Sequence, residues 1–114
     1  MINIENINPG TIANNLTPFC ATHPGEVLKD EIEERGISQK ALAERIGVSY
    51  RIVNDILNER RPLSTEMAML FEAALGIPAN TLLSLQMDYN IHAAKQNKSF
   101  LTRLASIGRV AAVL

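Results

Sequence analysis

Apolar residues recur three and four positions apart through most of the chain, the spacing that places side chains on one face of an α-helix. Residues that begin or end helices divide this pattern: serine caps a helix start, proline fits the first turn and glycine ends a helix. The divisions predict five helices: Pro24 to Gly36, Ser38 to Gly47, Ser49 to a point before Pro62, Ser64 to Gly76, and Pro78 onward. A sixth helix is expected near residues 100–107, with Gly108 weakening its last turn. No series of strands is present, so the sequence predicts an all-α fold of five to six helices.

The fifth predicted helix is apolar on more than one side. Its main stripe comprises Leu82, Leu85 and Tyr89, and other apolar residues lie off that stripe. A helix of this kind is covered by two neighbours, one of which can belong to another subunit. The surplus apolar residues are expected to include the contact between two copies of the chain: Leu83, Met87, Ile91, Phe100 and Leu104. The alternative is that they complete the core within one chain.

Length and composition are those of a single folded domain. The chain has 114 residues, of which 46% are hydrophobic and 20% are charged, so a core is feasible and disorder is not expected. No apolar run approaches the ~18 to 20 residues of a membrane span, and the N-terminus lacks the pattern of a signal peptide. A cytoplasmic location is therefore expected.

The sequence offers few residues that could form a metal site or a catalytic site. Cys20 is the only cysteine, and with His23 it supplies at most half of the ligands that zinc requires. The three glutamates in residues 31–34 are typical of a solvated helix face rather than of a paired acid and base, which would need a pocket. His23 and His92 are expected to cap a helix or to lie at the surface. We expect no metal, no cofactor and no enzymatic activity.

Composition divides the chain into three regions. Residues 1–22 are rich in asparagine and are expected to form an N-terminal arm without its own core. Residues 23–92 form the helical domain, and residues 93–114 form a C-terminal helical tail. Isoleucines alternate with polar residues at the start of the arm, so it could add as an edge strand to a partner. The alternative for the arm is a frayed terminus.

The stretch from residue 38 to residue 58 has the pattern of a helix-turn-helix. Two short helices can cross steeply only if the residue at the crossing is small and the turn residue tolerates a positive φ. Ala43 and Gly47 meet these two requirements. Val53 and Ile56 give the second helix an apolar face that packs on the first, which leaves its opposite face free to contact a partner.

The free face of this second helix carries residue types suited to duplex DNA. Arginine binds guanine edges, asparagine binds adenine, and hydroxyls and amides at helix starts reach phosphates. The net charge is only −1, but residues 38–61 hold five bases against three acids. The candidate DNA-binding residues are Ser38, Gln39, Ser49, Tyr50, Arg51, Asn54, Asn58, Arg60 and Arg61. Gln39 is expected to contact the DNA backbone, and the last two arginines to clamp phosphates. Asp55 is expected to orient Arg51, four residues earlier on the same face.

Residues 23–90 resemble the HigA-type antitoxins, also called the plasmid-maintenance or VapI family, within the Xre helix-turn-helix superfamily. The part from Ser38 to Gly76 is common to many phage-type repressors, and the runs HPGE at residues 23–26 and LQMDY at residues 85–89 narrow the resemblance. The resemblance implies a lambda-repressor-like domain and a homodimer that binds a palindromic operator in double-stranded DNA. It further implies repression of the protein's own operon and neutralisation of a HigB-type, RelE-like toxin that cleaves mRNA.

The sequence departs from this family in two places and leaves other functions open. The family commonly has a tryptophan where Leu82 or Leu83 stands, which is a substitution in the core, and many members lack so long an arm. Toxin binding is expected at the arm, at the acidic first helix or at both, because RNA-cleaving toxins are usually basic. A stand-alone Xre-family regulator without a toxin partner, and a helical interaction module that does not bind DNA, are the alternatives.

Overall fold

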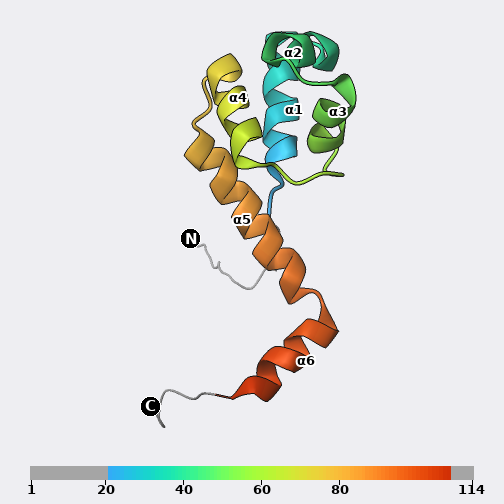
Figure 1. The fold of residues 1–114 in the computed structure, drawn as a ribbon, viewed down its shortest axis with the longest axis vertical. Helices are drawn as coiled ribbons and strands as arrows, with labels where there is room; N and C mark the ends of the chain where they lie inside the picture. Colours follow the sequence, from blue (N-terminus) through green and yellow to red (C-terminus); the bar gives the residue numbers. More distant parts are fainter. Residues whose placement is uncertain (1–20, 109–114) are drawn as a thin grey trace, which may run out of the picture.

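The computed structural model describes residues 21–108, and this part of the chain forms six α-helices and no strand. The helices are α1 (Pro24–Arg35), α2 (Gln39–Ile46), α3 (Tyr50–Leu57), α4 (Thr65–Leu75), α5 (Ala79–Lys95) and α6 (Lys98–Ile107). The first four helices and the start of α5 form one compact group, from which α5 leads away to α6 (Figure 1). The predicted all-α fold of five to six helices is confirmed.

Local signals in the sequence set the helix boundaries, as predicted. The Oγ atoms of Ser38, Ser49 and Ser64 each accept a hydrogen bond from a backbone N–H three residues later, at 3.0, 3.3 and 3.2 Å. Each serine therefore caps one of α2, α3 and α4. Helix α5 begins one residue later than expected, because Pro78 lies just before the helix with an extended backbone.

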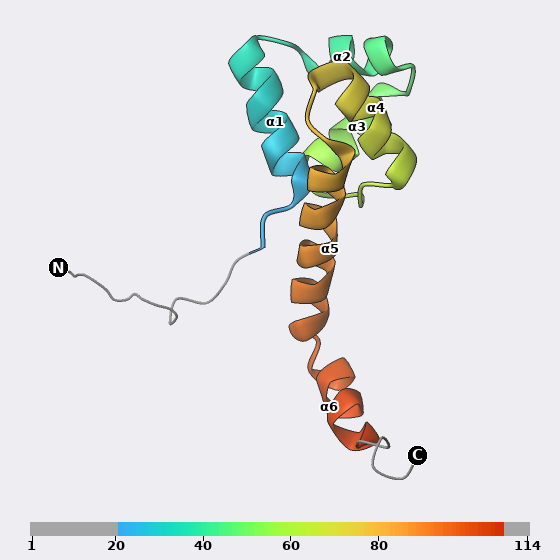
Figure 2. The same cartoon turned by 90° about the vertical axis from the view of Figure 1, so that its left-hand side faces the viewer.

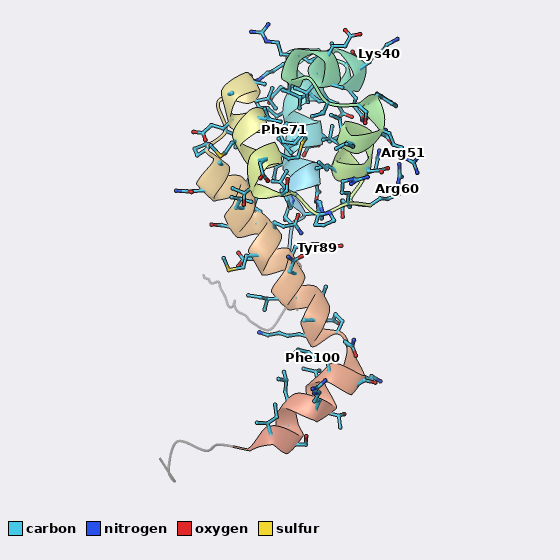
Figure 3. The ribbon with its side chains drawn as sticks, viewed as in Figure 1. Lys40, Arg51, Arg60, Phe71, Tyr89 and Phe100 are labelled. Atoms are coloured by element: carbon cyan, nitrogen blue, oxygen red, sulfur yellow. The ribbon has the colours of Figure 1, made fainter. Side chains whose placement is uncertain are left out.

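The core lies where α1 to α5 meet. Phe71 of α4 is fully buried at its centre (Figure 3), together with Leu28 of α1, Val53 and Ile56 of α3, and Leu82 of α5. Burying each of these side chains contributes about 1.5–3 kcal/mol. Leu82 is one of the two positions at which the family that the sequence resembles commonly has a tryptophan. It is a core residue, as expected.

His23 caps the N-terminus of α1 and contacts α5. His23 is buried, and its Nδ1 accepts a hydrogen bond from the N–H of Gly25 at 2.9 Å, so it caps α1 as the sequence suggested. Its ring meets the Tyr89 ring edge to face, with 4.8 Å between the centroids. Burial lowers the pKa of His23, and the nearby Glu59 carboxylate partly opposes that shift. A buried imidazole that accepts from a helix N-terminus is held in its neutral form.

A buried glutamine ties the loop after α3 to α5. Gln86 has only 5% of its surface exposed, and its Oε1 accepts from the N–H of Leu63 at 2.8 Å. Its Nε2 donates to Asn90 Oδ1 at 2.9 Å, so both ends of the amide are bonded. No local pattern in the sequence indicates this role of Gln86, because its partner Leu63 lies 23 positions away.

Beyond the core, α5 and α6 carry an exposed apolar surface. Helix α6 contacts α5 and extends away from the other helices (Figure 2). We call Met87, Ile91, Phe100 and Leu104 the distal apolar surface, and their exposed fractions are 59%, 47%, 42% and 48%. These four residues therefore do not complete a core within residues 21–108, whereas Leu83 packs partly against the core. None of the described helices is long and apolar enough to cross a membrane.

Candidate nucleic-acid interface

Helices α2 and α3 form the helix-turn-helix that the sequence predicted. Ala43, at the crossing, is 2% exposed, and Val53 and Ile56 on α3 are fully buried. Gly47 ends α2 with a φ of 76°, and the N–H groups of Gly47 and Val48 both donate to the Ala43 carbonyl, at 2.9 and 3.1 Å. Since a positive φ is strained for residues with a Cβ, the glycine allows the sharp turn into α3.

The face of α3 opposite the core is exposed. Tyr50 is 52% exposed at the start of the helix, and Arg51 and Ser49 beside it are also exposed. The side chains of Arg51 and Arg60 project on the same side of the molecule, away from the core around Phe71 (Figure 3). The structure thus brings these predicted DNA-binding residues together on one surface.

Asn54 occupies the middle of this surface and is bonded on both sides. Its Nδ2 donates to Gln39 Oε1 at 2.8 Å and to the Tyr50 hydroxyl at 3.4 Å. Its Oδ1 accepts from Arg60 Nη2 at 2.7 Å. Asn54 therefore links the first residue of α2 to the loop that follows α3, rather than projecting alone from the helix.

The expected pairing of Asp55 with Arg51 is wrong. The Asp55 carboxylate pairs instead with Arg60 and Arg61, at 3.5 Å from Oδ1 to Arg60 Nε and 3.5 Å from Oδ2 to Arg61 Nη2. The chain reverses after α3 because Glu59 adopts a φ of 64°, and the Arg60 N–H then donates to the Asp55 carbonyl at 2.7 Å. This reversal places both guanidinium groups beside Asp55.

Asn58 is placed against the protein rather than on the open face. It is half-buried, its Nδ2 donates to the Asn54 carbonyl at 2.9 Å, and its Oδ1 accepts from Lys29 Nζ at 3.5 Å. Asn58 thus closes the end of α3 and connects it to α1. Ser38 and Ser49 lie exposed at the starts of α2 and α3, where a phosphate can approach free backbone N–H groups.

Residues 21–108 contain no group of three or more His, Cys, Asp or Glu side chains that could hold a metal ion. His23 is occupied as a helix cap and lies in the core. Cys20, which was considered with His23 as half of a zinc site, lies outside the described residues, as do residues 1–20 as a whole. The surface around α3 therefore stands as the candidate functional site of the part that the structure describes.

Comparison with known proteins agrees with this geometry. A family model described as helix-turn-helix matches residues 28–82. Virulence-associated protein I of Dichelobacter nodosus is 34% identical over 79 residues, which covers 68% of this chain and 73% of the relative. The chain belongs to the VapI, or HigA-type, family of helix-turn-helix proteins.

Two solved antitoxin structures resemble this VapI-family chain over most of its length. The antitoxin GraA is 33% identical, with a TM-score of 0.73, over 81% of this chain and 99% of that one. The Pseudomonas aeruginosa antitoxin HigA, solved with the higBA promoter, is 31% identical, with a TM-score of 0.71, over 81% of this chain and 99% of that one. The VapI-family resemblance seen in the sequence is thereby confirmed.

Proposed function

We propose that this protein is the antitoxin of a type II toxin–antitoxin pair. It binds operator DNA as a dimer, represses its own operon and neutralises a HigB-type, RelE-like toxin that cleaves mRNA. The observation that carries the proposal is an exposed recognition helix in a chain that belongs to the VapI family and is similar to an antitoxin solved with a promoter. We propose that it acts by binding DNA and a toxin, and we assign it no enzymatic activity.

The DNA-binding part of the proposal rests on the surface around α3. Arg51 and Tyr50 lie at its exposed start, where side chains of a recognition helix reach base edges in the major groove. Ser38, Ser49 and Gln39 lie at the starts of the two helices, where they suit contacts to phosphates. Arg60 and Arg61 extend the basic surface beyond the helix, and such charges make binding depend strongly on salt.

The dimer follows from the distal apolar surface and from the needs of operator recognition. One recognition helix reads only a few base pairs, so specificity calls for two half-sites about 34 Å apart. A two-fold dimer presents two copies of α3 to such a palindrome. Exposed Met87, Ile91, Phe100 and Leu104 supply an apolar area that a second copy of the chain can cover.

The toxin-binding part rests on family membership and on charge. Glu33 and Glu34 are exposed on α1, whereas Glu31 pairs with Arg35 at 2.6 Å. The two exposed carboxylates can attract a basic toxin. Within the domain of residues 23–92, we assign DNA binding to Ser38 through Arg61, and we assign toxin binding to α1, to the N-terminal arm of residues 1–22 or to both. A protein that binds DNA and an mRNA-cleaving toxin works in the cytoplasm.

Co-expression with the neighbouring reading frame tests this function. If a small basic protein is encoded beside this one, its expression alone should stop growth, and expression of both proteins should restore it. Binding of the purified protein to its own promoter, measured in parallel, separates the alternatives. Promoter binding without growth rescue would indicate a stand-alone regulator, and rescue without promoter binding would indicate an interaction module that does not bind DNA.

A further inference from the structure

The orientation of the Asn54 amide is fixed by the groups around it. A guanidinium can only donate hydrogen bonds, so the atom of Asn54 that faces Arg60 at 2.7 Å must be its oxygen. The Nδ2 group then faces Gln39 Oε1 at 2.8 Å and the Tyr50 hydroxyl at 3.4 Å. The Asn54 amide nitrogen, which carries two hydrogens, therefore has two acceptors within the protein.

This arrangement differs from that of an asparagine that reads DNA. To bind adenine, an asparagine presents its oxygen and its amide together to the N6 and N7 atoms of the base. Asn54 would have to release Tyr50 or Gln39 before its amide could donate to N7. Arg51, by contrast, is exposed and projects away from the core (Figure 3).

Arg60 is held from the other side by Asp55. Its Nε lies 3.5 Å from Asp55 Oδ1, while its Nη2 donates to Asn54. A continuous set of contacts thus runs from Asp55 through Arg60 and Asn54 to Gln39. It joins α2, α3 and the loop after α3, which are the three segments that carry the candidate DNA contacts.

We propose that Asn54 is a positioning residue, which holds Gln39, Tyr50 and Arg60 in their DNA-binding arrangement and does not itself read a base. The inference rests on the proposed DNA-binding function. Glutamine and arginine side chains lose much rotational freedom when they are ordered at an interface. A network that orders them before DNA arrives reduces that loss on binding.

A double-variant cycle tests the inference. Gln39→Ala and Asn54→Ala are made singly and together, and each protein is titrated with its promoter duplex at fixed salt. If Asn54 acts through Gln39, the double variant binds no more than about two-fold weaker than the weaker single variant. If the two residues make independent contacts, their losses multiply, and that result overturns the inference.

Asn58→Ala is the matched control for this cycle. It removes the same amide from the same helix, but the Asn58 side chain bonds to the Asn54 backbone and to Lys29 rather than to Gln39. In the Gln39→Ala, Asn58→Ala double variant, the fold losses of promoter affinity caused by the two single changes should multiply, to within about two-fold. Thermal melting of every variant confirms that the proteins compared are folded.

Base preference distinguishes a positioning role of Asn54 from a direct contact between Asn54 and a base. Promoter duplexes with single base-pair replacements are titrated with wild type, Tyr50→Ala and Asn54→Ala. Because Gln39 and Arg60 are assigned to phosphates, a positioning role predicts that Asn54→Ala loses preference only at base pairs where Tyr50→Ala also loses it. A loss at a base pair that Tyr50→Ala leaves intact would make Asn54 a base reader. Failure of the wild type to bind its promoter would instead overturn the proposed function, and this inference with it.

Discussion

Gly25, in the first turn of α1, lies directly against the backbone carbonyl of Ile56 near the end of α3. A Cβ placed at residue 25 would collide with that carbonyl oxygen. The two helices can therefore approach this closely only because residue 25 is glycine. Since α3 carries the candidate recognition face, the Gly25–Ile56 contact also sets where that face lies relative to α1.

We expect Gly25→Ala to destabilise the protein by about 1–3 kcal/mol, because the added carbon meets backbone atoms that cannot rotate away. In a domain of this size each kcal/mol lowers Tm by about 4–8 °C. Thermal denaturation measures the loss. Glu33→Ala, at an exposed position on the same helix, is the control and should change stability by about 0.5 kcal/mol or less. A wild-type Tm for Gly25→Ala would show that α1 and α3 separate without cost.

Gly47→Val should lower both the stability and the affinity for operator DNA. The φ of 76° at Gly47 costs a residue with a Cβ on the order of 1–2 kcal/mol, and valine more than most because it is β-branched. Gly36, with a φ of 72° at the end of α1, allows a matched control. Gly36→Val should lower Tm by a similar amount and leave the DNA affinity of the folded protein unchanged. If Gly47→Val and Gly36→Val bind operator DNA equally well, the geometry of the turn at Gly47 does not affect DNA binding.

Much of the fold could be predicted because its signals are local. Ser38, Ser49 and Ser64 bond to backbone groups three residues away, and Gly36 and Gly47 end their helices through their own φ angles. Such features depend on a few neighbouring residues, which the sequence lists in order. The helix-turn-helix followed from the same kind of signal.

The pairing of Asp55 with Arg60 and Arg61 could not be predicted in this way. It depends on the chain reversal at Glu59, where a residue other than glycine adopts a positive φ. Helical spacing favoured Arg51 as the partner, because spacing assumes that the helix continues. Tertiary contacts were missed for a related reason: Gln86 bonds to a residue 23 positions away, and Gly25 meets a carbonyl of another helix.

Acidification should destabilise the protein through His23. Burial lowers its pKa in the folded state below the ordinary value of 6.5, with Glu59 opposing the shift, so the unfolded chain binds more protons just below that pH. The stability that depends on neutral His23 is complete above about pH 6.5 and decreases as the pH falls from there toward the folded-state pKa. Denaturant unfolding between pH 5 and pH 7.5 measures this decrease.

His23→Asn is the control for this pH dependence. Asparagine also caps helices well, and it does not titrate in this range. The variant should lose stability because it fills less of the core, but its stability should vary less between pH 5 and pH 7.5 than that of the wild type. The same slope in both proteins would assign the pH dependence to other groups.

The distal apolar surface predicts a dimer. Light scattering of the wild type should give twice the chain mass, and Met87→Glu or Leu104→Glu should give folded monomers, because both side chains are about half or more exposed within one chain. The monomers should bind the operator more weakly, since they present one recognition helix instead of two. Met69→Glu is the control: Met69 is 60% exposed on α4, away from this surface, and its variant should stay dimeric. A wild-type monomer at micromolar concentration would contradict the proposed dimer.

Whether the exposed face of α3 reads an operator is tested by the affinity of wild type and Arg51→Ala for two duplexes at the same salt concentration. One duplex comes from the protein's own promoter, and the other has the same bases scrambled. The wild type should bind the promoter duplex more tightly than the scrambled one. Arg51→Ala should lose about 1–3 kcal/mol on the promoter and much less on the scrambled duplex, because a base contact acts only at the right sequence. Arg61→Ala should instead weaken binding to both duplexes alike. Equal binding of the two duplexes by the wild type would contradict the claim that the exposed face of α3 reads an operator.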